Sequence, residues 1–335
     1  MIGAGAIASG AKRRVWPLLS RALQGLALVA LCFLLIRVVL WAFEGGAGAF
    51  DSALSPWLLG GAALLYLAGH GFRILRLALL IGGWRVGFRE IAAFHLMTAA
   101  ASLTAPLKLG EIYRIIELTN IAGDGLRALV IAWWERVLDA LAILCLIALA
   151  LVSAATSQAH LHGVAVLTAA FLAATAVAFW VVPDNLRRLS VLIIRRYDAP
   201  ATVPVLAIVD YLRRTIQAAP YLVHNKFASL ATITILVWIC ELSAFVLAAP
   251  AAAGSFNAAR DGFLSFLSAI AEGVTLLSVI TSSEAAGLLS GFAVYLAVTQ
   301  TPLVVLGFLA APFYMRRPVR ERFLQLGALN GPGGA

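Results

Sequence analysis

The feature that most constrains this chain is a series of long apolar runs, each sufficient to cross a lipid bilayer as a helix. Examples are Val15 to Phe43, Ala128 to Ala154 and Gly287 to Tyr314. A helix needs about 20 mainly apolar residues to span the hydrocarbon core. Only helices and closed barrels satisfy all backbone hydrogen bonds there. The sequence therefore predicts an all-α polytopic membrane protein.

Composition supports this class and excludes others. Hydrophobic residues make up 62% of the chain and charged residues 12%. The net charge of +9 comes from basic residues beside apolar runs, which indicates anionic lipid headgroups as partners and no nucleic acid. The three cysteines lie singly inside apolar runs, so we expect no disulfide framework, no metal and no cofactor.

Lysines and arginines gather in the short connections between the apolar runs. By the positive-inside rule such connections are cytoplasmic, which places both termini on the cytoplasmic side of a bacterial plasma (inner) membrane. A second helix, from Pro56 to Phe72, ends just before Arg73 on this interpretation. The basic clusters are Lys12 to Arg14, Arg73 to Arg89, Arg187 to Lys226 and Arg316 to Arg322.

Two shorter apolar segments, Ile91 to Pro106 and Phe263 to Ile280, decide the topology. If both crossed fully, basic connections would fall outside the cell. We therefore predict six full transmembrane helices and two re-entrant segments. Each half of the chain, 15–154 and 164–314, then has the same layout with opposite orientation, as in the inverted repeats of transporters.

We expect one integral membrane domain over residues 1–322. Its connection 183–226 alternates arginines with apolar residues and predicts two short amphipathic helices on the inner leaflet, around Leu186 to Tyr197 and Val205 to Ala218. The Gly-Pro-rich tail, 323–335, is expected to be disordered.

A first polar cluster follows the first re-entrant segment. Pro106 ends one element and Gly110 permits close backbone approach, so a helix beginning near Glu111 would offer its N-terminus to an anion. Lys108 and Arg114 add positive charge for a lipid phosphate. Glu111 would meet a cationic headgroup or pair with Arg114 at i, i+3 spacing. An interfacial loop with that local pair remains the alternative.

A second cluster lies inside the apolar run that begins at Ala128. Glu135, Arg136 and Asp139 stand two to three turns into it, where ionisable groups face the bundle interior or water. They predict either a structural ion pair or a substrate or proton site. His70 and His95 have no partner nearby in sequence, and we expect packed or hydrogen-bonded roles for both.

The second half of the chain offers a counterpart to the first cluster. Ser282, Ser283 and Glu284 close the second re-entrant segment and would line the same cavity, or else cap the last helix. Glu272 and Glu241 are secondary candidates. As a lone intramembrane carboxylate, Glu241 is expected to pair with an arginine of another helix.

Together these residues resemble a known family. An arginine after the second helix (Arg73 or Arg76), A-P-L-K-L-G-E-I-Y-R at 105–114 and W-E-R-V-L-D at 134–139 are similar to the membrane domain of the lysylphosphatidylglycerol synthase, or flippase-like, family. The resemblance implies movement of a lipid with a charged headgroup, such as an aminoacylated phosphatidylglycerol or a polyprenyl-phosphate-linked sugar. The chain ends soon after its last helix, so we expect the family's soluble synthase domain to be absent.

The leading hypothesis is thus a lipid flippase-like transporter rather than an enzyme. Neither a Walker A loop nor a GxSxG or HExxH motif is present. One alternative is an intramembrane enzyme that modifies a lipid headgroup, with Glu135 or Asp139 as general base. Another is a non-catalytic subunit of a lipid-synthesis enzyme. The sequence also leaves open a second copy of the chain as a partner.

Overall fold

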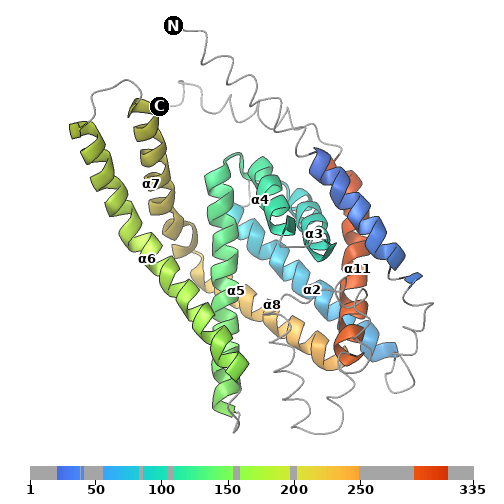
Figure 1. Ribbon diagram of the computed structural model, residues 1–335. Helices are drawn as coiled ribbons and strands as arrows, with labels where there is room; N and C mark the ends of the chain where they lie inside the picture. The colour runs from blue at the N-terminus through green and yellow to red at the C-terminus, as the bar shows by residue number, and fades with distance from the viewer. Residues whose placement is uncertain are drawn as a thin grey trace.

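A computed structural model describes residues 21–37, 39–40, 56–82, 86–104, 109–153, 159–196, 202–248 and 290–315. Their regular elements are all helices, which confirms the predicted all-α fold for these residues (Figure 1). Residues 21–37 are helical. The further helices are α2 (Pro56–Ile81), α3 (Phe88–Thr104), α4 (Leu109–Ala122), α5 (Gly125–Ser153), α6 (Ala159–Arg196), α7 (Thr202–His224), α8 (Phe227–Ala248) and α11 (Ser290–Met315).

Within the described residues, four helical stretches are long and apolar enough to cross a membrane. Three of them lie in the central bundle, in α2, α8 and α11, and the fourth is most of α6. This is the composition of a membrane-embedded protein. The stretches are Pro56–Ile81, His162–Arg196, Phe227–Ala248 and Tyr295–Met315.

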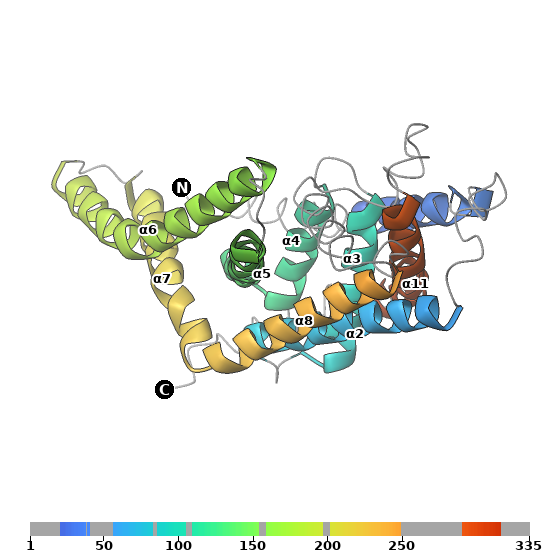
Figure 2. The same cartoon turned by 90° about the horizontal axis from the view of Figure 1, so that it is seen from below.

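The centre of the molecule is a bundle in which α2 lies along α8 and α3 lies along α11 (Figures 1 and 2). A glycine lies at each contact, and only the one on α11 is required by the spacing. At Gly69 an added Cβ would meet the Cβ of Cys240 at 3.5 Å, and at Gly307 it would lie only 2.4 Å from the Cβ of Ala100. The backbones of α3 and α11 therefore lie too close at Gly307 to leave room for a side chain there.

The helices α3 and α4 form a hairpin between α5 and α11 (Figure 2). Near its turn, a Cβ on Gly110 would lie 2.5 Å from the Cα of Ser102, so the predicted close approach at Gly110 is made to α3. At the open end, Arg127 Nη2 donates to the carbonyl of Ile81 at 3.1 Å, which joins the end of α2 to the start of α5. The ends of the helices that precede and follow the hairpin thus lie next to each other.

The helix α6 differs from the prediction. A separate short helix was expected around Leu186 to Tyr197, but α6 begins at Ala159 and continues through Pro183 to Arg196 over 38 residues. The predicted boundary rested on a fall in hydropathy, which indicates where a chain leaves the lipid for water. A helix can continue across that point, because its backbone hydrogen bonds form in both lipid and water. Proline weakens a helix interior without always ending it. The second expected helix, Val205 to Ala218, lies within α7, which packs along α6.

Candidate functional site

Two arginines of α2 lie where the sequence predicted a cytoplasmic connection. The predicted helix end at Phe72 is wrong, because α2 continues to Ile81 and carries Arg73 and Arg76 inside the bundle. Arg76 is 2% exposed. Arg73 and Arg76 thus belong to a helix rather than to a connection, and carboxylates of other helices bind them.

Arg76 joins three helices. Its Nη1 and Nη2 donate to the two carboxylate oxygens of Asp139 on α5, at 2.7 and 3.1 Å, and Nη1 also lies 3.3 Å from the hydroxyl of Thr234 on α8. This two-pronged geometry is the strongest form of an arginine–carboxylate contact. Asp139, one of the three charged residues predicted as a cluster in the run that begins at Ala128, therefore has its ion-pair partner on α2.

Arg73 forms the second pair, with Glu241 of α8, at 2.8 Å. The hydroxyl of Tyr295 on α11 lies 3.3 Å from the other carboxylate oxygen. Glu241 therefore has the interhelical arginine that a lone intramembrane carboxylate predicts.

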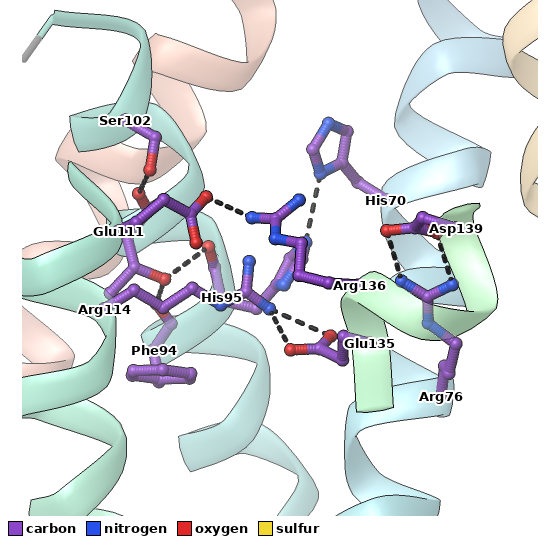
Figure 3. A network of polar contacts seen from close by, with 11 residues as sticks. His70, Arg76, Phe94, His95, Ser102, Glu111, Arg114, Glu135, Arg136 and Asp139 are labelled. Atoms are coloured by element: carbon purple, nitrogen blue, oxygen red, sulfur yellow. Dashed lines mark hydrogen bonds and ion pairs between the residues drawn. The ribbon is translucent and has the colours of Figure 1, made fainter. Parts of the chain in front are cut away.

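Two further pairs cross between α4 and α5 (Figure 3). Arg114 Nη2 donates to both carboxylate oxygens of Glu135, at 2.9 and 2.7 Å, and these side chains are 11% and 5% exposed. Arg136 pairs with Glu111, with exposed fractions of 51% and 35%. The expected local pair between Glu111 and Arg114 is thus wrong, because each finds a partner on α5. The Arg114–Glu135 pair is therefore buried, whereas the neighbouring Glu111–Arg136 pair is partly exposed.

Glu117 is a buried carboxylate that sequence reasoning missed. It is fully buried and accepts hydrogen bonds from Gln24 at 3.2 Å, Asn120 at 3.2 Å and Tyr314 at 2.9 Å. These donors link the N-terminal helix, α4 and α11. The signal was available in the sequence, since Glu117 interrupts an apolar stretch two turns after Gly110.

His70 of α2 and His95 of α3 contact each other, with 3.1 Å between Nδ1 of the first and Nε2 of the second. Both are buried. The hydrogen-bonded role expected for each histidine is therefore a mutual one.

A basic groove lies at the far end of α6. Its residues recur every three or four positions, so they share one face of the helix, and they line an open cavity of about 780 Å³. Such a face is suited to anionic headgroups at a membrane surface. The lining residues are Asp184, Arg187, Arg188, Val191, Leu192, Arg195 and Arg196.

On α7, outside the four apolar stretches, electrostatics are local. Hydrogen bonds from Arg213 and Arg214 hold the pKa of Asp210 below its usual range. Burial, together with a hydrogen bond to Asp124, raises the pKa of Tyr211 to about 12. The Tyr211–Asp124 contact attaches α7 to the start of α5.

Several candidates fall outside the described residues: Pro106, Lys108, Glu272, Ser282, Ser283 and Glu284, together with the segment Phe263 to Ile280. In the part of the chain that is described, no group of three or more histidine, cysteine, aspartate or glutamate side chains is arranged to hold a metal ion.

Comparison with known proteins gives no match, whether to a family model, a curated protein or a solved structure.

Proposed function

We propose that this chain is a lipid flippase-like transporter, which moves a lipid with a charged headgroup between the two leaflets. The observation that carries the proposal is the half-exposed Glu111–Arg136 pair next to the dry Arg114–Glu135 pair. Charged groups inside an apolar bundle are costly unless paired or used. Here the outer pair is open enough to exchange partners with a ligand.

The headgroup would enter by replacing one partner in these pairs. A lipid phosphate competes with Glu111 for Arg136, because a guanidinium binds phosphate and carboxylate oxygens with similar geometry. Arg114 then lies next in line, and the released Glu111 carboxylate is available to a headgroup amine. Aminoacylated phospholipids and polyprenyl-phosphate-linked lipids both carry the required phosphate, and both agree with the family resemblance.

The proposal includes the topology of six full crossings and two re-entrant segments. Support comes from the α3–α4 hairpin, which brings Glu111 and Arg114 to α5 and starts and ends beside the joined ends of α2 and α5. The second re-entrant segment, with Ser282, Ser283 and Glu284, would approach from the opposite side as the inverted counterpart. The bacterial inner membrane, with both termini cytoplasmic, agrees with the basic groove at the end of α6.

Exchange of a labelled lipid in proteoliposomes tests the function. We expect Glu111→Ala and Arg136→Ala to abolish exchange while the protein still folds, since the outer pair is too exposed to carry much stability. Arg214→Ala, which removes a 75% exposed arginine of α7, is the matched control and should retain exchange. Full exchange in both site variants would reject the proposal.

An intramembrane headgroup-modifying enzyme has less support. Its candidate bases, Glu135 and Asp139, each accept hydrogen bonds from an arginine, and an arginine-bound carboxylate is a poor general base.

A further inference from the structure

The His70–His95 pair is a buried titratable contact that the proposed lipid site does not use. The two side chains are 5% and 1% exposed and bridge α2 to the re-entrant hairpin at α3. On its other side, His70 Nε2 lies 3.4 Å from Arg73 Nη1. Figure 3 shows His95 between His70 and the Arg114–Glu135 pair.

These contacts fix the hydrogen positions of the neutral pair. Arginine only donates, so His70 Nε2 accepts and His70 carries its hydrogen on Nδ1. That hydrogen is donated to His95 Nε2, which leaves the hydrogen of His95 on Nδ1. Among the described residues this Nδ1 has no hydrogen-bond partner. At one end of the pair, His70 Nε2 thus accepts a hydrogen bond from Arg73. At the other end, His95 Nδ1 carries a hydrogen that has no acceptor among the described residues.

The surroundings are cationic on both sides of the pair. The charges of Arg73 and Arg114 act on both rings, and that of Arg76 on His95. Burial and these guanidinium groups both oppose a positive charge on either ring. The acidic and phenolic groups nearby are Glu241, Tyr66 and Tyr295 beside Arg73, Asp139 on Arg76 and Glu135 on Arg114.

We propose that the pair binds one proton when a net-anionic phosphate headgroup occupies Arg114 and Arg136, so that lipid and proton cross together. The inference rests on the proposed function and adds its substrate class and driving force. An anion at Arg114 lowers the positive field on His95 and thereby favours the protonated pair. By linkage, the proton favours the anion equally.

The proton steps balance. Arg73 turns fully to Glu241 and a proton binds at His70 Nε2. The pair then holds one added proton, and the Nδ1 hydrogen of His70 stays in the contact with His95 Nε2. When the lipid leaves on the other side, the added proton dissociates from the pair, so that one proton crosses with each lipid.

The test uses the full chain in phosphatidylcholine vesicles that contain a fluorescent phosphatidylglycerol, under an imposed pH gradient. With one proton per lipid, we expect the probe to accumulate in the less acidic leaflet by up to about tenfold per pH unit. His70→Asn and His95→Gln keep a polar atom at the contact position but cannot carry the proton, and should abolish this accumulation. His224→Gln, on the exposed end of α7, is the matched control.

The possible results separate the two proposals. If the unaltered protein exchanges the probe rapidly but the probe does not accumulate in either leaflet, proton coupling is rejected. The proposed lipid transport is not contradicted by that result. If no probe is exchanged, the proposed function fails, and ¹⁵N NMR of the two histidines decides the linkage. If the histidines become protonated at higher pH with lysophosphatidylglycerol than with lysophosphatidylcholine, the linkage between anion and proton is supported. If they titrate identically with the two lipids, the linkage is rejected.

Discussion

At the scale of single residues, the candidate site is a set of arginine–carboxylate pairs that cross between helices. Arg73, Arg76, Arg114 and Arg136 each bind a carboxylate on another helix. The sequence showed which residues were charged inside apolar runs, but spacing along one helix cannot reveal partners on another. For this reason the i, i+3 pair of Glu111 with Arg114 was a reasonable prediction and was wrong.

The buried pair of α2 and α5 gives a stability prediction. Asp139→Asn leaves Arg76 charged and 2% exposed, and removing one partner of a buried pair typically costs about 3–5 kcal/mol. We expect a clear fall in the melting temperature of the detergent-purified protein. Asp184→Asn, at an exposed position of α6, is the control.

The double variant Arg76→Met with Asp139→Leu sharpens this test. It removes both charges, so we expect it to melt above the single variant. The matching single variants are Arg76→Met and Asp139→Leu. If the double variant loses as much stability as these two single variants lose together, Arg76 and Asp139 are not coupled.

At the scale of elements, the positions of most helices were predictable. The run Ala128 to Ala154 became α5 (Gly125–Ser153), and Gly287 to Tyr314 became α11 (Ser290–Met315). Apolar length determines such helices. Hydropathy did not predict the continuous α6, the long α2 or the contact faces, because these depend on which side chains meet after folding.

The contact between α3 and α11 gives a prediction at this scale. In Gly307→Ala the new Cβ would lie 2.4 Å from the Cβ of Ala100 and 2.9 Å from the carbonyl oxygen of Leu96. The helices must separate, at a cost of about 1–3 kcal/mol, and thermal unfolding in detergent should show it. At Gly71 an added Cβ meets nothing within 4 Å, so Gly71→Ala should not destabilise. Equal melting of both variants would contradict the close packing.

At the scale of the whole molecule, the proposed topology requires both ends of the α3–α4 hairpin to lie on one side of the membrane. In a chain without Cys32, Cys145 and Cys240, single cysteines at Gly87 and Gly125 should react with an impermeant thiol reagent from the cytoplasmic side only. Both positions are exposed. Labelling from opposite sides would make the hairpin a full crossing and invalidate the re-entrant assignment.

The two pairs between α4 and α5 have one more consequence. Each helix contributes one positive and one negative side chain: Glu111 and Arg114 from α4, Glu135 and Arg136 from α5. Once parted, Glu111 and Arg114 can pair with each other within α4 at i, i+3 spacing. When the hairpin moves relative to α5, these four groups therefore carry no net charge through the bilayer. Moving one elementary charge through 100 mV involves about 2.3 kcal/mol, so a membrane voltage would do no net work on these four groups if they moved together.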